Sequence, residues 1–136
     1  MLQYRDSLEG IGPNEIRGFF VDWPNPPTPE THLRALARSD RIVLAIDMST
    51  NHVVGFISAV TDETLSAYIP LLEVLPAYQG QGIGSALVTK MLALLNEIYM
   101  VDLTCDPDIA PFYARFGMKP ATAMSLRHYD RQSGSG

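Results

Sequence analysis

Residues 71–87 read LLEVLPAYQGQGIGSAL, in which an apolar strand runs into a glycine-rich turn that opens directly onto a helix. Glycine lets the backbone bend sharply and approach a ligand closely, so the N–H groups of the turn can point into one concavity. The positive end of the helix dipole lies at the same place. This stretch therefore predicts a phosphate-binding turn that needs no lysine or arginine of its own.

The turn differs from two better-known phosphate-binding turns. A P-loop requires a lysine before its Ser or Thr, whereas Gly84 is followed directly by Ser85. A Rossmann turn reads G-x-G-x-x-G, whereas residues 80–84 read GQGIG. The turn therefore predicts neither nucleotide hydrolysis nor dinucleotide binding.

A second motif lies downstream, where residues 105–118 read CDPDIAPFYARFGM. The pattern Gln-x-x-Gly-x-Gly, formed by Gln79, Gly82 and Gly84, resembles the acyl-coenzyme A turn of the GCN5-related N-acetyltransferase (GNAT) superfamily. The second motif resembles the late helix of that superfamily, and locally that of the arylalkylamine N-acetyltransferases. The resemblance covers most of the chain. It implies an enzyme that moves acetyl from acetyl-CoA to a primary amine of a small molecule, such as a polyamine or an arylalkylamine.

The resemblance also implies where the coenzyme and the general acid lie. The coenzyme would contact the strand, the turn, the helix start and the beginning of the second motif, at Leu72, Val74, Gln79, Gly80, Gln81, Gly82, Ile83, Gly84, Ser85 and Asp106. Tyr113 occupies the position beside the coenzyme sulfur. A phenol with a pKa of about 10 is protonated at neutral pH and can reprotonate a leaving thiolate.

The residue that takes the proton from the amine is less clearly marked. Glu73 is a carboxylate in an apolar strand, so it either faces the acceptor cleft or is a paired structural group. Tyr68 is the second candidate for this role. Asp22 and Trp23 lie in a proline-rich loop and are candidates for an amine counter-ion and an acceptor wall, although Trp23 could equally anchor its loop.

Composition limits the other functions of the chain. The formal net charge of −5 argues against a nucleic-acid partner and is compatible with a cationic acceptor. We expect no membrane span and no signal peptide, and a cytoplasmic location. Family analogy suggests a homodimer. Two other functions stay open, namely a non-catalytic acyl-CoA sensor and an acetyltransferase for protein or peptide amines.

The length of 136 residues predicts a single domain over residues 1–131, followed by a flexible tail over residues 132–136. The fold class is α/β, with a mixed, mostly antiparallel sheet, a central β-α-β crossover and helices on both faces. The expected strands are 41–48, 52–62, 65–75, 99–105 and 119–129. The expected helices are a short one from residues 12–15 onward, one from Thr28 or Thr31 to Ser39, one over 84–98 and one in the second motif.

The histidines and the cysteine predict no further chemistry. His32, His52 and His128 lack metal-ligand spacing and are expected at surface or strand positions, so no metal site is predicted. Cys105 is expected to be a small buried residue rather than a nucleophile, because no histidine lies near it in the sequence.

Overall fold

The computed structural model describes residues 1–135, and its centre is a five-stranded sheet with strand order β1-β2-β3-β4-β5. The strands are β1 (Leu2–Arg5), β2 (Arg41–Asp47), β3 (His52–Thr61), β4 (Ser66–Val74) and β5 (Met100–Asp102). Neighbouring strands are antiparallel except β4 and β5, which are parallel. A parallel pair needs a crossover connection, and here the crossover contains a helix.

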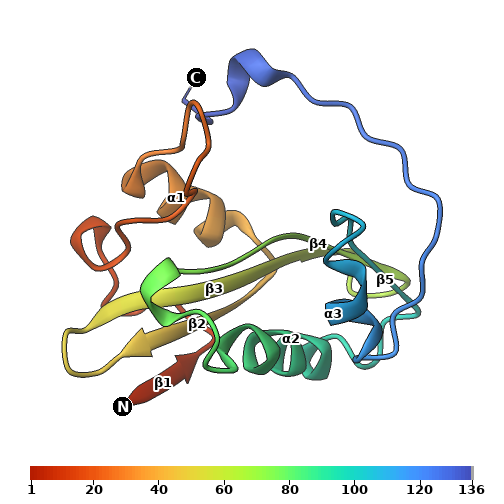
Figure 1. Ribbon diagram of the computed structural model, residues 1–136, viewed down its shortest axis with the longest axis horizontal. Helices are drawn as coiled ribbons and strands as arrows, with labels where there is room; N and C mark the ends of the chain where they lie inside the picture. The colour runs from red at the N-terminus through yellow and green to blue at the C-terminus, as the bar shows by residue number, and fades with distance from the viewer. Residues whose placement is uncertain (136) are drawn as a thin grey trace.

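Three α-helices surround this sheet. They are α1 (Pro29–Arg38), α2 (Ile83–Leu94) and α3 (Ala110–Ala114), and the short 3₁₀ helices are η1 (Pro13–Glu15), η2 (Pro76–Tyr78) and η3 (Tyr129–Arg131). Helices α1 and α2 lie on opposite faces of the sheet (Figure 1). The mixed sheet, the crossover and the helices on both faces confirm the predicted fold class.

Strand β2 shows why the core has two halves. Side chains alternate along a strand, so Val43 and Ala45 join the cluster under α2, whereas Ile42, Leu44 and Ile46 join the cluster under α1. All five are buried. Because both faces of this strand are covered, it reads as a continuous apolar run rather than as an alternating one.

Helix α2 packs closely on the sheet at Gly55 of β3. A Cβ atom there would lie 3.1 Å from Leu87 Cδ1 and 3.2 Å from Ile83 Cγ2, so a side chain would push the helix away. Along α2 and its C-terminal cap, Ile83, Leu87, Val88, Met91 and Leu95 are buried. The helix ends at Leu94, which is 37% exposed, rather than at residue 98.

Two sequence predictions about the elements are wrong, and one strand was not predicted. The early helix is only the three-residue η1, and the apolar residues after it, Ile16, Phe19 and Phe20, are buried without forming a helix. Residues 119–128 form no strand and are exposed, and they arc from α3 toward α1 (Figure 1). The strand that was not predicted is β1, which pairs with β2 at the opposite edge of the sheet from β5.

The C-terminal residues contact the α1 side of the molecule. Gln132 Oε1 accepts a hydrogen bond from the Asn25 amide at 3.0 Å, and the Gly134 carbonyl accepts one from Arg34 Nη2 at 2.9 Å. The predicted tail includes residue 136, which lies outside the described residues. The domain limits and the flexibility of the tail stay predictions.

Candidate active site

Strands β4 and β5 part in the middle of β4. Their ladder ends where Tyr68 pairs with Asp102, whereas β4 continues to Val74. Along residues 71–74, β4 therefore pairs with β3 on one side and has a free edge on the other. A free edge in the interior of a sheet offers backbone hydrogen-bonding groups to a ligand.

The backbone groups of Leu72 and Val74 point to this free edge. The Leu75 amide donates to the Val54 carbonyl at 2.8 Å. The backbone N–H and C=O groups of the odd-numbered residues in this part of the chain therefore point toward β3. Because backbone groups alternate in direction along a strand, those of Leu72 and Val74 face the opposite way. Their side chains pack against the α2-facing core.

A β-bulge precedes the free edge. Ser58 pairs with Leu71 and Val60 pairs with Tyr68, so two steps along β3 correspond to three along β4. The extra residue falls around Ile69 and Pro70, and a proline is tolerated there because it has no N–H to donate. Bulges are common beside active sites, since they re-aim the side chains that follow.

The glycine-rich turn lies at the end of the free edge and leads into α2. Gly80 and Gly82 have φ of +79° and +82°, in the left-handed region that glycine adopts without strain. Gly82 is the N-cap of α2, and no side chain caps the helix. The first amides of α2 therefore have no intrahelical acceptor and no capping group, which leaves them available to an anion.

Two side-chain contacts fix the turn to the sheet. Gln79 Nε2 donates to the Val74 carbonyl at 3.0 Å, which ties the turn to the end of β4. The Tyr78 hydroxyl donates to Asp47 Oδ2 at 2.7 Å, which ties η2 to the β2–β3 hairpin. Hydrogen bonds from Ser49 and from Tyr78 lower the pKa of Asp47 to about 2, so this anchor is charged at neutral pH.

Helix α3 brings aromatic side chains to the turn. Phe112 Cζ lies 3.7 Å from the position that a Cβ atom would take on Gly84, and Val74 Cγ2 lies 3.9 Å from the same position. The ring of Tyr113 lies edge-on to that of Phe112, with centroids 5.0 Å apart. Both rings pack against the core cluster under α2, so Phe112 lies against the turn at Gly84 and Tyr113 lies next to Phe112.

Burial raises the pKa of Tyr113 above its usual value, and the neighbouring Cys105 contributes in the same direction. The phenol therefore keeps its proton throughout the neutral range. Cys105 itself is exposed, which contradicts the expectation of a buried residue. Asp106 is also exposed, and its backbone carbonyl accepts from the Ile109 amide at 2.9 Å at the approach to α3.

Arg115 was missed by the sequence reasoning. Its Nη2 donates to Ser85 Oγ at 2.9 Å, in the first turn of α2. Its guanidinium carbon lies 5.1 Å from the ring centroid of Phe112 and 5.7 Å from that of Phe116. The position of Arg115 three residues after Phe112 could have indicated it, because residues three apart on a helix share a side.

Glu73 faces the other side of β4 from Tyr113. Its carboxylate accepts two bonds from the Phe20 amide, at 2.8 and 3.0 Å, and one from the Val21 amide at 3.3 Å. Phe20 has a φ of +63°, which is uncommon for a bulky residue. Glu73 therefore holds the loop before α1 against the sheet, and its role in proton transfer stays a prediction.

Asp22 and Trp23 lie in this same loop. Trp23 is 37% exposed, and its ring lies 4.8 Å from that of Phe20, measured between centroids. Asp22 is exposed and has a φ of +67°. Both residues thus lie next to the loop amides that bind Glu73, and they stay candidates for acceptor binding.

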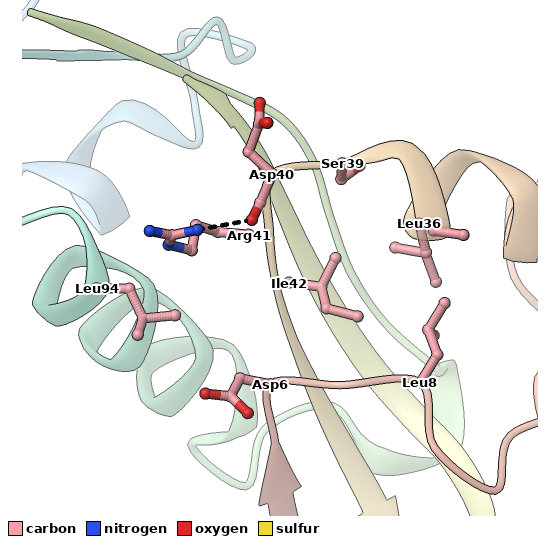
Figure 2. Close-up of a pocket in the computed structure, with 9 residues that line it drawn as sticks. Asp6, Leu8, Leu36, Ser39, Asp40, Arg41, Ile42 and Leu94 are labelled. Carbon is pink, nitrogen blue, oxygen red and sulfur yellow. Dashed lines mark hydrogen bonds between the residues drawn. The ribbon is translucent and has the colours of Figure 1, made fainter. Parts of the chain in front are cut away.

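Tyr68 is held at the point where the two strands part. Its hydroxyl lies 2.9 Å from Thr104 Oγ1, and its ring lines a hollow of about 460 Å³ that Asp102 also lines. The larger hollow, of about 670 Å³, lies away from the turn, between the end of α1, the start of β2 and α2 (Figure 2). It includes none of the predicted site residues.

His32 is buried among aromatic rings rather than at the surface. Its ring lies 4.4 Å from Phe56, 4.8 Å from Phe20 and 5.5 Å from Phe19, measured between centroids. Its Nε2 has no hydrogen-bond partner within residues 1–135. Burial lowers its pKa to about 4, so this ring is neutral at neutral pH.

Within residues 1–135, no three His, Cys, Asp or Glu side chains are grouped so that they could hold a metal ion. In the same range, no helix has the length and apolar character needed to cross a membrane.

Residues 9–118 match the model of the Acetyltransferase (GNAT) family. Because this match covers most of the chain, the chain belongs to the GNAT family, whose members are acyl-CoA-dependent N-acetyltransferases. The family resemblance read from the two motifs is thereby confirmed. The closer similarity to arylalkylamine enzymes is not shown.

Solved structures share this fold. A protein of Deinococcus radiodurans R1, described as a candidate acetyltransferase, has a TM-score of 0.96 and 48% identity, covering 99% of this chain and 94% of that one. A GNAT-family acetyltransferase from Streptococcus pneumoniae TIGR4 has a TM-score of 0.72 and 31% identity, over 94% of this chain and 98% of that one.

Curated relatives are more distant and longer. An uncharacterized N-acetyltransferase of Porphyra purpurea is 30% identical over 71% of this chain and 58% of its own length. The histone acetyltransferase TAP1 of Glycine max is 29% identical over 73% of this chain and 47% of its own length. The chain thus spans about half of the length of these relatives.

Proposed function

We propose that this chain transfers acetyl from acetyl-CoA directly to a primary amine of a small molecule. The observation that carries the proposal is the free edge of β4, which leads straight to the uncapped start of α2, where Phe112 lies against Gly84 and Tyr113 lies next to Phe112. Acetyl transfer needs a held thioester, a polarised carbonyl, a neutral amine and a proton for the thiolate. The residues around this edge have the chemistry for each task.

The coenzyme would lie along the turn and the free edge. The amides of Gly80 through Ser85 suit its diphosphate, because they surround an uncapped helix start. The backbone groups of Leu72 and Val74 suit its pantetheine and acetyl parts, since they face the free edge of β4. The Val74 carbonyl already accepts from Gln79, so its N–H is the group left for the coenzyme.

The two proton-transfer roles fall on opposite sides of β4. Tyr113 packs on the α2 side and is the proposed acid for the leaving thiolate. Glu73 lies on the α1 side, next to Asp22 and Trp23, and is the proposed acceptor of the amine proton, with Tyr68 as the second candidate. A thioester at the edge between them would present its carbonyl carbon to an amine on the α1 side and its sulfur to Tyr113 on the α2 side, so that the C–S bond would break as the thiolate takes up the phenol proton.

A protein or peptide amine is the second candidate acceptor. The relative that favours it is the Glycine max protein named as a histone acetyltransferase. A small amine is favoured instead only by the predicted resemblance of residues 105–118 to arylalkylamine enzymes, which stays a prediction. One assay separates the three hypotheses, namely a small-molecule acceptor, a protein or peptide acceptor, and a sensor that binds acyl-CoA without turnover.

That assay is a free-thiol screen with acetyl-CoA against polyamines, arylalkylamines, amino acids and histone-tail peptides. We expect thiol release with at least one small amine and a lower rate with peptides. Saturable acetyl-CoA binding without thiol release from any amine would instead identify a sensor. Release with peptides alone would contradict a small-molecule acceptor.

A homodimer and a cytoplasmic location are also proposed. The exposed segment 119–128 supports the dimer, because it carries Lys119 and Arg127 without any carboxylate in a chain whose net charge is −5. Light scattering of purified protein would test the dimer. A monomer mass at roughly 100 µM protein, a concentration at which even a dimer with a weak Kd would be populated, would contradict it. Cell fractionation would test the location.

A further inference from the structure

We propose that Arg115 is a phosphate ligand of the coenzyme, delivered by α3 to a turn that has no cation of its own. The inference rests on the proposed function, because it assigns a further residue to the same coenzyme site. Residues 71–87 contain neither lysine nor arginine. The sequence alone therefore indicates a turn in which backbone amides bind the phosphates unaided.

The geometry of Arg115 places a guanidinium at the start of α2. Its Nη2 lies 2.9 Å from Ser85 Oγ, and Ser85 is the third residue of the helix. The rings of Phe112 and Phe116 lie within 5.7 Å of the guanidinium carbon. Stacking against two rings limits the motion of a long side chain, so less entropy is lost when it binds a ligand.

Charge makes this position unusual without an anion. The start of a helix carries partial positive charge, so a guanidinium beside it is repelled. Within residues 1–135, Arg115 forms no ion pair with a carboxylate, and its bonds are those to Ser85 Oγ and to the Phe112 carbonyl at 3.5 Å. An anion held between the guanidinium and the helix start would turn this repulsion into attraction.

The donors that remain suit a phosphate. A guanidinium carries five N–H groups in a planar fork, and these two bonds leave the Nη1 group without a partner in the described chain. Arginine binds phosphate oxygens in a bidentate manner, and the serine hydroxyl beside it offers a further donor. Coenzyme A presents two phosphate groups of this chemistry, the diphosphate and the 3′-phosphate.

The test compares Arg115→Met with Arg38→Met, a matched loss of an exposed arginine on α1. Each protein is titrated with acetyl-CoA and with 3′-dephospho-acetyl-CoA. We expect Arg115→Met to weaken acetyl-CoA binding about 10-fold or more, because a charge-assisted hydrogen bond is lost. The loss should appear in KM for acetyl-CoA, with kcat and the acceptor KM nearly unchanged.

The two ligands distinguish the two phosphate sources, and either result supports the proposal. A loss confined to acetyl-CoA assigns Arg115 to the 3′-phosphate, whereas an equal loss with both ligands assigns it to the diphosphate. Arg115→Lys keeps the charge without the fork and should fall between the wild type and Arg115→Met. The melting temperature of each variant is measured in parallel. This measurement separates a loss of phosphate binding from a substitution that only loosens α3.

Affinity in Arg115→Met equal to that of Arg38→Met would overturn the inference while leaving the proposed function intact. A melting temperature lowered equally in Arg115→Met and Arg115→Lys, with unchanged affinity in the folded protein, would show a structural role and overturn it too. Failure of the wild type to bind acetyl-CoA would remove the proposed function and this inference with it.

Discussion

Tyr113 is the residue whose surroundings most favour a single chemical role. Its ring is packed against Phe112 and the α2-facing core, so burial raises the pKa of its hydroxyl. A phenol with a raised pKa holds its proton at neutral pH and can give it to a thiolate of comparable basicity. The same packing holds the ring next to Phe112.

We predict that Tyr113→Phe lowers kcat roughly 100-fold or more, because a positioned general acid contributes at least this much. The Kd for acetyl-CoA should change little, since the ring and its packing remain. Steady-state kinetics and calorimetry measure the two effects. Tyr99→Phe, a loss of hydroxyl at a residue that is 82% exposed, is the control, and equal rates in the two variants would remove the assignment.

Glu73 has both a structural and a proposed chemical role, and Glu73→Gln separates them. The amide oxygen of glutamine can still accept from the Phe20 amide, so the loop before α1 should stay in place. The variant cannot take up the amine proton. We predict roughly 100-fold lower kcat with a melting temperature within a few degrees of the wild type, as for loss of a general base.

Glu97→Gln is the matched control for Glu73, because Glu97 is exposed on the segment after α2. A rate in Glu73→Gln close to that of this control would show that Glu73 only anchors the loop. Tyr68 would then become the residue to test.

At the residue scale, the sequence predicted those parts of the site that adjoin each other in the chain. The turn from Gln79 to Ser85 could be predicted as a phosphate-binding turn because its glycines and its helix start are contiguous. Arg115 was missed because it reaches Ser85 across space from another helix. Likewise, nothing in the sequence shows that the amides of Phe20 and Val21 bind Glu73, since these partners are far apart along the chain.

At the scale of elements, the turn depends on the hairpin that holds it. The Tyr78 hydroxyl donates to Asp47, whose lowered pKa of about 2 keeps it charged. This bond links η2 to the end of β2. The position of the glycine-rich turn is therefore set partly by a strand that contributes no ligand to it.

We predict that Tyr78→Phe weakens acetyl-CoA binding about 5-fold, because a charge-assisted hydrogen bond that orients the turn is lost. Fluorescence or calorimetric titration measures the change. The control is Tyr129→Phe, at a residue that is 74% exposed. Unchanged affinity in Tyr78→Phe would show that Gln79 and the packing of α2 suffice to hold the turn.

Elements whose own residues form a strong apolar pattern were predicted correctly. Elements that depend on contacts with residues far away in the sequence were not. Strands β2 to β4 and helix α2 carry long apolar runs, so their type was correct. The early helix failed because Gly18 and Phe20 take positive φ, at +97° and +63°, where the loop bends onto Glu73. Residues 119–128 alternate like a strand, but a strand forms only where another strand pairs with it.

At the scale of the whole molecule, the α1-facing core contains a titratable ring. His32 is 2% exposed, and its pKa of about 4 lies below the usual value of 6.5. Between these pH values His32 therefore binds a proton in the unfolded chain but stays neutral in the folded chain. The stability that the neutral His32 ring contributes is fully present above about pH 6.5 and is lost as the pH decreases toward 4.

We predict that the free energy of unfolding drops by about 3 kcal/mol between pH 7 and pH 4 from this ring alone. Urea denaturation across this range measures it, and His32→Leu should remove the corresponding part of the slope. Protonation of Asp47 and Asp62 also lowers the free energy of unfolding, but at lower pH, from about 4 to 2, because their pKa values in the folded chain are lowered to about 2. An identical slope in His32→Leu would contradict the role of His32.

The most direct test of the central claim is calorimetric titration of the intact protein with acetyl-CoA. The turn and the free edge of β4 predict saturable binding of one coenzyme per chain. Gly82→Glu should abolish it, because Gly82 has a φ of +82° and a carboxylate there would repel the diphosphate. Absence of saturable binding in the wild type, or equal binding by folded Gly82→Glu, would contradict the account.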